Sequence, residues 1–273
     1  MPESASSRLW FPGLALACAS LVACVASGEE ASQAKPEPPR IAMFLPLAVP
    51  TDATTKVTAR GWNLEGVKEL TSAEGRIQLK LLTSAKATVP NGLDAKHVGD
   101  TQVEFEITVP KDVAPVDVTI VVSGEGGKSE PRGLAIGSRH PRAEEKEWND
   151  GFRQAQKLEF PQTVDGLIHE NRNVDVFSFE LSVPQRVGMD VLASRRGSSL
   201  DSLLTLFDER GTMLAVNDDH DGSSDSKIAI DLSAGRYFIS LQDANDRGSI
   251  AHPYRLIVQS EDASMPTTGL TIP

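Results

Sequence analysis

Residues 173–181 read Asn-Val-Asp-Val-Phe-Ser-Phe-Glu-Leu, and this stretch decides the fold of the C-terminal half of the chain. Apolar and polar side chains nearly alternate along it, with one irregularity where Val176 and Phe177 are adjacent. Successive side chains of a strand point to opposite faces of a sheet, so alternation indicates a strand with one buried face. The stretch therefore predicts a core strand of a β-sheet.

Further short stretches of this kind surround it between residues 158 and 260. Turn-forming residues separate them, as at Glu209-Arg210-Gly211. The expected strands are residues 163–168, 187–192, 199–208, 214–216, 228–232, 234–241 and 254–258. Many short strands with turn signals between them predict a β-sandwich over residues 158–260.

The N-terminal half shows the same organisation between residues 40 and 137. Glycine, proline and aspartate punctuate its apolar stretches, as at Pro90-Asn91-Gly92. The expected strands are residues 41–47, 54–60, 77–82, 101–109 and 116–122. The sequence therefore predicts an all-β protein with two β-sandwich domains, 40–137 and 158–260.

Composition narrows the classes of partner. The 273 residues carry a formal net charge of −11, and 40% of them are hydrophobic but only 5% aromatic. Valine, leucine and isoleucine must therefore fill the cores. The negative charge argues against nucleic acid or an anionic membrane as the main partner and is compatible with cation binding.

The first 28 residues predict a secretory signal, because a lone basic residue, Arg8, precedes an apolar segment rich in small residues. Two processing routes stay open. Leu21-Val22-Ala23-Cys24 matches a bacterial lipobox, which would lipidate Cys24 and tether the protein to a membrane, whereas cleavage near residues 26–28 would release it. Both cysteines, Cys18 and Cys24, lie in this segment, so the mature chain has no disulfide. The protein is expected to be periplasmic, extracellular or at the cell surface.

A Pro-rich spacer at 29–39 and a tail at 261–273 flank the two predicted domains. The segment that joins the domains, residues 138–157, is acidic. In an extended chain its side chains Glu145, Glu147 and Asn149 would point in one direction, with Asp150 beside them.

Carboxylates crowded in this way repel one another unless a cation lies between them, and ligands that are all oxygen suit Ca²⁺. The alternative is a solvated acidic linker. Residues 144–157 also contain good helix formers, so local propensity disagrees with an extended metal site. This disagreement suggests the hypothesis that the cation extends a segment that is otherwise helical or disordered.

The C-terminal half resembles the bacterial pre-peptidase C-terminal domain through an ordered series of motifs. They are Glu147-Trp148-Asn149-Asp150, Val164-Asp165-Gly166, residues 173–177, the run 206–219 that ends in Asn-Asp-Asp, Gly235-Arg236-Tyr237 and Tyr254-Arg255-Leu256. The family often has proline where this chain has Trp148. The resemblance implies a jelly-roll-like β-sandwich of the kind found at the ends of secreted bacterial peptidases and other exported proteins.

Related clostridial collagen-binding domains bind calcium through their N-terminal linker. The resemblance therefore implies Ca²⁺ ligands among the matching linker residues and in the loop that would complete such a site. These residues are Glu145, Glu147, Asn149, Asp150, Asn173 and Asp175. Asn173 departs from the aspartate or glycine that is usual there.

The N-terminal half resembles an IPT/TIG-type immunoglobulin-like domain. The resemblance rests on Pro46, on Arg60-Gly61-Trp62-Asn63-Leu64 and on Pro110 before a late strand. Trp62 could serve as a ligand platform, although a half-buried packing role is favoured.

A second acidic run, Asn217-Asp218-Asp219-His220-Asp221-Gly222, has oxygen ligands at alternate positions like an EF-hand loop. Asp225 occupies position 9, but Ile228 stands where the bidentate glutamate belongs, and no flanking helices are predicted. A hydrophilic hairpin loop is favoured over a weak second calcium site.

No catalytic motif stands out in the sequence. The five histidines are scattered without a zincin pattern, and no Gly-x-Ser-x-Gly elbow is present. Tyr237 and Tyr254 are expected in the core. We therefore expect an exported, non-catalytic binding or scaffolding protein that is stabilised by Ca²⁺ and recognises an extracellular protein or polysaccharide. A cell-surface spacer or adhesion module and an accessory subunit of a secreted hydrolase are the alternatives.

Overall fold

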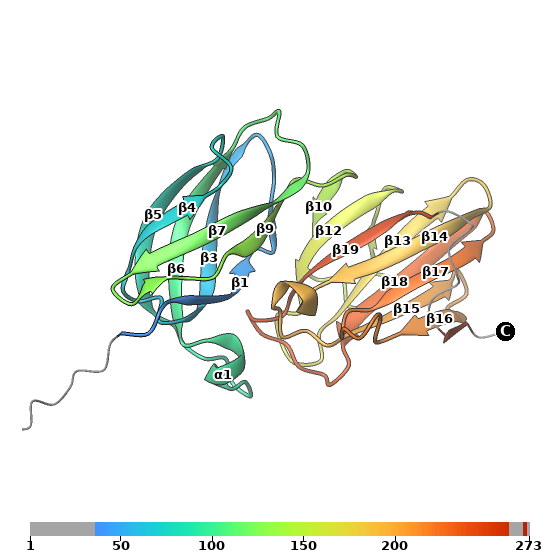
Figure 1. The fold of residues 1–273 in the computed structure, drawn as a ribbon. Coiled ribbons are helices and arrows are strands. Elements are labelled where there is room, and N and C mark those ends of the chain that lie inside the picture. The colour runs from blue at the N-terminus through green and yellow to red at the C-terminus, as the bar shows by residue number, and fades with distance from the viewer. Residues whose placement is uncertain (1–35, 262–269, 272–273) are drawn as a thin grey trace, which may run out of the picture. The chain divides into compact units, whose positions relative to one another are not determined.

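A computed structural model describes residues 36–261 and 270–271 of the chain. These residues form strands with only two short helical turns, α1 (Ala95–Val98) and η1 (Ser194–Arg196), which confirms the predicted all-β class (Figure 1). The predicted signal 1–28 and lipobox lie outside the described residues, as do part of the spacer and most of the tail. No described helix has the length and apolar character to span a lipid bilayer.

Residues 40–136 form two sheets, which we call the N-terminal sandwich. One sheet has the order β1-β3-β6-β5, with β1 (Arg40–Leu45), β3 (Ala53–Trp62), β6 (Thr101–Val109) and β5 (Gln78–Lys86). The other has the order β2-β9-β7-β4, with β2 (Ala48–Val49), β9 (Arg132–Ile136), β7 (Val116–Gly124) and β4 (Val67–Ser72), and β8 (Gly127–Lys128) pairs with β7. The sequence pattern missed β2, β4, β8 and β9, which are short or half-exposed.

One apolar cluster holds these two sheets together. Val57, Phe105 and Ile107 come from the first sheet, and Val118, Ile120 and Leu134 come from the second. Each of these side chains is almost fully buried, because alternate positions of every strand face the partner sheet. Gly61 fits where β1 and β3 approach closely, since a Cβ there would lie 1.9 Å from the carbonyl oxygen of Arg40.

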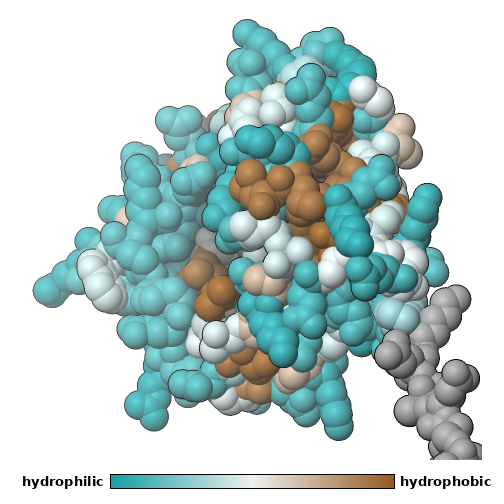
Figure 2. Space-filling model, turned by 90° about the vertical axis from the view of Figure 1, so that its left-hand side faces the viewer, coloured by the Kyte–Doolittle hydropathy of each residue, from teal (hydrophilic) through white to brown (hydrophobic). Residues whose placement is uncertain are grey.

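The face of the protein that carries the edge strands β4 and β5 is largely hydrophilic, with a few apolar areas between the polar side chains (Figure 2). Lysines on these strands form ion pairs, Lys68 with Glu125 and Lys80 with Glu106. Charged side chains on edge strands disfavour pairing with another chain.

Residues 142–260, together with residues 270–271, form two further sheets, which we call the C-terminal sandwich. One has the order β10-β12-β19-β14-β17, with β10 (Arg142–Glu144), β12 (Gln162–Leu167), β19 (Pro253–Ser260), β14 (Gln185–Leu192) and β17 (Lys227–Leu232). The other has the order β11-β13-β18-β15-β16-β20, with β11 (Gln156–Lys157), β13 (Val174–Leu181), β18 (Gly235–Asp243), β15 (Ser202–Asp208), β16 (Met213–Asn217) and β20 (Leu270–Thr271). Strands β12 to β19 follow the predicted stretches closely.

The core of the C-terminal sandwich contains the stretch that predicted it. Phe177, Phe179 and Leu181 of β13 pack with apolar side chains of the opposite sheet, including Val187 and Leu256. Tyr237 and Tyr254 belong to the same buried cluster, as expected from their strand motifs.

The acidic segment 138–157 contains no helix and forms two short strands with a turn at residues 152–154 between them. Its strand β10 pairs in parallel with β12, and its strand β11 pairs in parallel with β13. The segment therefore adds one edge strand to each sheet of the C-terminal sandwich, instead of forming a separate linker as predicted. Asp165 of β12 reinforces this attachment, because its carboxylate accepts a hydrogen bond from Arg142 Nε at 2.5 Å.

Candidate calcium site

Three carboxylates converge where the segment between β10 and β11 crosses the end of β13. Glu145 follows β10 directly, Glu147 lies two residues further, and Asp175 is the second residue of β13. One oxygen atom of each lies within 4.8 Å of one oxygen of the others. We call these three residues the carboxylate cluster.

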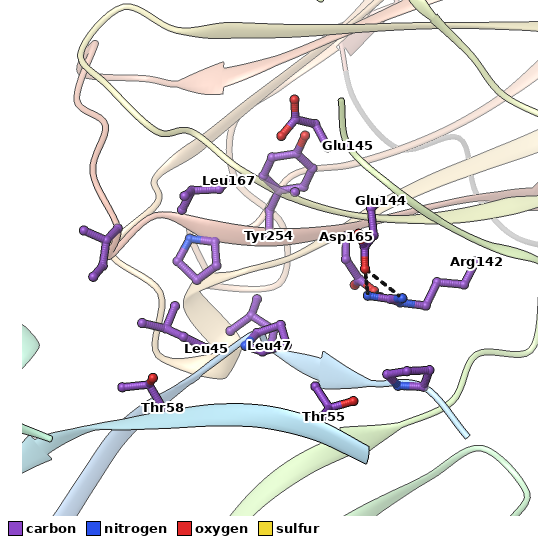
Figure 3. A pocket seen from close by; sticks show the side chains of 15 residues that line it. Leu45, Leu47, Thr55, Thr58, Arg142, Glu144, Glu145, Asp165, Leu167 and Tyr254 are labelled. Carbon is purple, nitrogen blue, oxygen red and sulfur yellow. Dashed lines mark hydrogen bonds and ion pairs between the residues drawn. The ribbon is translucent and has the colours of Figure 1, made fainter. Parts of the chain in front are cut away.

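Burial makes this cluster costly without a counter-charge. Asp175 is fully buried, and its Oδ2 accepts a hydrogen bond from the hydroxyl of Tyr254 at 2.5 Å. Within the described part of the chain, Oδ1 of Asp175 and Oε1 of Glu145 are buried and have no hydrogen-bond partner. Figure 3 shows the carboxylate of Glu145 close to the hydroxyl of Tyr254. Buried polar atoms normally have partners, so two unpartnered carboxylate oxygens in one place are suited to binding a cation.

Burial and the neighbouring carboxylates also raise the pKa values of Glu145 and Asp175. Burial, followed by the nearby charge of Glu147, raises the pKa of Glu145 to about 7. Burial also raises the pKa of Asp175 to about 8, and the charges of Glu145 and Glu147 add to this rise. A bound cation would reverse both effects by favouring the ionised carboxylates.

Asn149 supplies a further unsatisfied group. Asn149 is 1% exposed, and neither its side-chain oxygen nor its side-chain nitrogen has a hydrogen-bond partner among the described residues. Its backbone carbonyl accepts a hydrogen bond from the amide of Val176 at 3.0 Å, which fixes Asn149 beside β13. Asn149 thus offers an unpartnered side-chain oxygen next to β13, the strand that carries Asp175.

Asp150 lies outside the carboxylate cluster and contacts Asn173, the remaining predicted ligand. The side-chain amide of Asn173 donates to Asp150 Oδ1 at 3.3 Å, and Asn173 Oδ1 accepts from the backbone amide of His169 at 3.1 Å. The ring of His169 also lies 2.5 Å from Glu147 Oε1 through Nδ1. These residues thus form a layer around the cluster and position Glu147. No sequence pattern indicated His169, because it belongs to no spaced motif.

The donor set fits a hard cation. Glu145, Glu147, Asp175 and Asn149 offer only oxygen ligands for a metal, and Ca²⁺ takes six to eight oxygens in flexible geometry. Three carboxylates around one point suit a divalent cation and exclude an anion.

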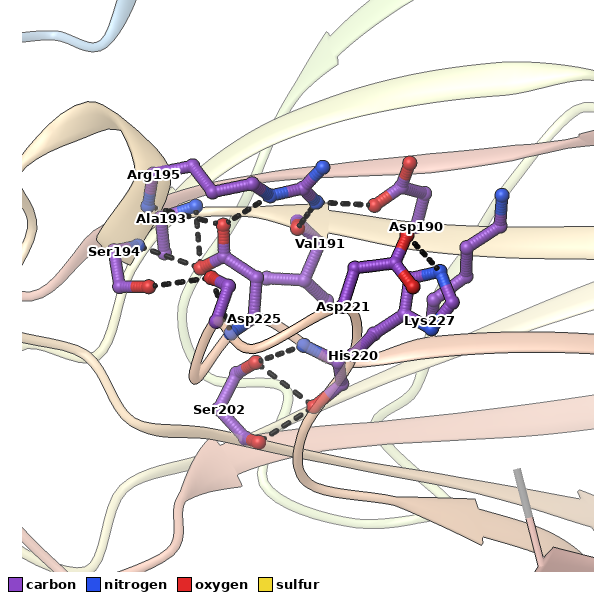
Figure 4. A network of polar contacts seen from close by, with 12 residues as sticks. Asp190, Val191, Ala193, Ser194, Arg195, Ser202, His220, Asp221, Asp225 and Lys227 are labelled. Carbon is purple, nitrogen blue, oxygen red and sulfur yellow. Dashed lines mark hydrogen bonds and ion pairs between the residues drawn. The ribbon is translucent and has the colours of Figure 1, made fainter. Parts of the chain in front are cut away.

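The second acidic run has a different role. Asp225 is fully buried and accepts hydrogen bonds from the backbone amides of Ala193, Ser194 and Arg195 and from Arg195 Nε (Figure 4). These donors occupy both of its carboxylate oxygens. Asp225 therefore stabilises the turn after β14, and it does not complete an EF-hand-like site.

The loop before Asp225 closes as a tight turn, in which the backbones of His220 and Ser223 exchange hydrogen bonds at 3.0 Å. The side chain of Asn217 bonds the backbones of Asp219 and Lys227. This arrangement agrees with the favoured hairpin-loop interpretation.

Trp62 is half-buried and is covered by its neighbours. The guanidinium of Arg40 lies 3.8 Å from the centre of its ring, and its indole nitrogen donates to the carbonyl of Ala95 at 2.8 Å. These contacts agree with the packing role that the sequence favoured.

Comparison with known proteins agrees with the C-terminal fold. Residues 173–243 match the family model of the bacterial pre-peptidase C-terminal domain. A probable subtilase-type serine protease of Deinococcus radiodurans is 36% identical over 101 residues, which is 36% of this chain but only 14% of that protein.

Two solved structures are also similar. The pre-peptidase C-terminal domain of a collagenase from Bacillus anthracis covers 38% of this chain and 94% of its own length, at 17% identity and a TM-score of 0.32. A glucan-utilisation protein of Bacteroides ovatus, solved with a mixed-linkage heptasaccharide, covers 79% of this chain and 72% of its own, at 9% identity and a TM-score of 0.24. The family match over residues 173–243 confirms that the C-terminal sandwich contains the predicted pre-peptidase C-terminal domain.

Proposed function

We propose that this chain is an exported, non-catalytic binding or scaffolding protein whose C-terminal sandwich is stabilised by Ca²⁺. Glu145, Glu147, Asn149 and Asp175 would hold the cation. The observation that carries the proposal is the set of buried side-chain atoms on Glu145, Asn149 and Asp175 that have no hydrogen-bond partner in the part of the chain that the structure describes. Native proteins rarely leave such groups unsatisfied, and a divalent cation would satisfy them together.

The location of the site explains how a cation would act. Glu145 is held beside one sheet, because its backbone amide donates to the carbonyl of Asp165 in β12 at 2.9 Å. Asp175 belongs to β13 in the other sheet. A cation between them would therefore cross-link the two sheets through the connecting segment, and Tyr254 would orient the Asp175 carboxylate through its hydroxyl.

The test is thermal unfolding of the exported chain in Ca²⁺ and in chelator. A ligand at 100 times its Kd stabilises by about 2.7 kcal/mol, which raises Tm by several degrees in a protein of this size. We expect this shift in the wild type and its loss in Glu145→Gln and Asp175→Asn. Glu209→Gln, an exposed carboxylate in a distant turn, is the control and should keep the shift. An equal Tm with and without Ca²⁺ in the wild type would refute the site.

The partner of such a module would be an extracellular protein or polysaccharide. The chain provides two sandwiches, and the face shown in Figure 2 is largely hydrophilic. Pull-down on insoluble collagen, cellulose and chitin separates this function from that of a passive cell-surface spacer, which would bind none of them.

One observation favours a second candidate, an accessory subunit of a secreted hydrolase. The matching region of the Deinococcus radiodurans relative belongs to a probable protease, whereas the described part of this chain folds as two sandwiches. Co-purification of a hydrolase with the tagged chain from its native source would support this candidate. Purification without one would favour the independent binding module.

We propose an immunoglobulin-like assignment for the N-terminal sandwich as well. Its two sheets around one apolar core, antiparallel except where the short β2 pairs in parallel with β9, support this assignment.

A further inference from the structure

Trp148 is an exposed side chain held between two of the proposed calcium ligands. It is 70% exposed, the largest exposed fraction among the described large hydrophobic residues. An indole that remains in water contributes little to folding by burial. The fold therefore does not account for a tryptophan at this position.

The backbone around Trp148 is fixed although its side chain is exposed. On one side, the carboxylate of Glu147 contacts the ring of His169 at 2.5 Å. On the other side, Asn149 is buried and bonds the amide of Val176. The His169 ring meets the indole in an edge-on arrangement, with ring centres 6.0 Å apart and an angle of 72°. The backbone on both sides of Trp148 is thus held in place, while the indole contacts the His169 ring and is otherwise largely exposed.

The polar groups beside the indole are of mixed sign. Glu170, whose side chain is 66% exposed, lies 3.8 Å from His169 Nε2. The exposed Lys146 and the exposed Asp150 are each two residues from Trp148 in the chain. Hydrogen-bond donors and acceptors around an open aromatic ring suit a neutral ligand that offers hydroxyl groups and an apolar C–H face. A single-sign patch, which would select a strongly charged partner, is not formed by these residues.

From this arrangement we infer that Trp148 is the stacking platform of a binding site for a neutral polysaccharide, and that Ca²⁺ preorganises it. The inference rests on the proposed calcium site for its cation dependence. Glu147 and Asn149 precede and follow Trp148 directly, so a cation bound by both fixes the backbone that presents the indole. Preorganisation of this kind improves affinity by lowering the entropy lost on binding. Linkage then requires that the polysaccharide also tightens Ca²⁺ binding.

The experiment is affinity gel electrophoresis of the exported chain through gels that contain hydroxyethyl cellulose, laminarin or galactomannan, each with Ca²⁺ and with chelator. Alginate gels test an anionic polysaccharide, and binding to insoluble collagen tests a protein partner. The variants are Trp148→Ala, Trp148→Phe and, as the matched control, Val183→Ala, which removes an exposed apolar side chain of the turn between β13 and β14.

We expect at least one neutral polysaccharide to retard the wild type in Ca²⁺. Trp148→Ala should bind it at least about tenfold more weakly, as is usual for a tryptophan that anchors an interface. Trp148→Phe should be intermediate, and Val183→Ala should behave as wild type. The thermal shift with Ca²⁺ should persist in Trp148→Ala, which shows that this variant is folded and that its calcium site is intact.

Several results would overturn the inference. They are absence of retardation by all three neutral polysaccharides, equal retardation of Trp148→Ala and wild type, and binding to alginate or collagen alone. Retardation that depends on Trp148 but not on Ca²⁺, together with no thermal shift, would refute the calcium site and the preorganisation while leaving the platform supported. The two proposals therefore fail separately.

Discussion

Raising the pH should destabilise the metal-free protein, and the carboxylate cluster sets the size of this effect. The folded-state pKa is about 7 for Glu145 and about 8 for Asp175, above the ordinary values of 4.5 and 3.8. Because the folded state holds these protons more tightly, the stability that they contribute is fully present below about pH 4 and is lost as the pH rises toward 8.

Each such group changes the free energy of unfolding by at most about 1.4 kcal/mol per pH unit. Together the two groups would lower the free energy of unfolding by about 5 kcal/mol between pH 5 and pH 7. Glu145 is only partly buried and solvent screens it, so we expect roughly 2–3 kcal/mol. Saturating Ca²⁺ binds the ionised carboxylates and should flatten this dependence.

Urea unfolding at pH 5, 6, 7 and 8 in metal-depleted buffer and in Ca²⁺ measures the effect. The double variant Glu145→Gln, Asp175→Asn serves as the reference, because it retains every other titrating group. The difference between wild type and variant isolates the cluster. A wild-type stability that is constant, or that increases relative to the variant between pH 5 and 7 without metal, would contradict the reasoning.

Three further variants test individual contacts. Tyr254→Phe removes the hydroxyl that bonds Asp175, so calorimetric titration should show roughly 10- to 100-fold weaker Ca²⁺ binding, and unchanged binding would argue against the orienting role. Asp225→Ala removes the carboxylate that accepts hydrogen bonds from three buried or half-buried backbone amides and a guanidinium. Urea unfolding should show that the free energy of unfolding falls by about 3–5 kcal/mol, while the thermal shift with Ca²⁺ remains. Arg60→Ala deletes a buried guanidinium that donates to the carbonyls of residues 88 and 99, and we expect a loss of about 2–4 kcal/mol without any effect on Ca²⁺ binding.

The sequence was most informative where the structural signal is local. The alternation along residues 173–181 identified β13 because a sheet with one buried face demands a period of two. The same reasoning failed for β4 and β9. β4 is six residues long and mostly exposed or half-buried, and β9 is five residues long, so neither shows a clear alternation.

The candidate site was predictable only in part. Glu145, Glu147 and Asn149 were identified from their spacing in an extended chain, and Asp175 from a family resemblance. The spacing also suggested Asp150, which in the structure contacts Asn173 instead of joining the three carboxylates. Local propensity could not decide between helix and strand for residues 144–157. Pairing of β10 and β11 with the two sheets decides it, because these partners are distant in sequence.

The sequence by itself determined the all-β class, the core strands of both sandwiches and the acidic character of the connecting segment, since each of these is set by residues that are neighbours in the chain. Only the tertiary structure decided which oxygens meet. It brought Asp175 and Tyr254 close to Glu145 and surrounded the Asp225 carboxylate with backbone amides. It also buried the side-chain amide of Asn149 without a hydrogen-bond partner among the described residues. These contacts join segments that are far apart in the sequence. Their energies depend on burial, and a local sequence pattern does not predict which polar groups become buried.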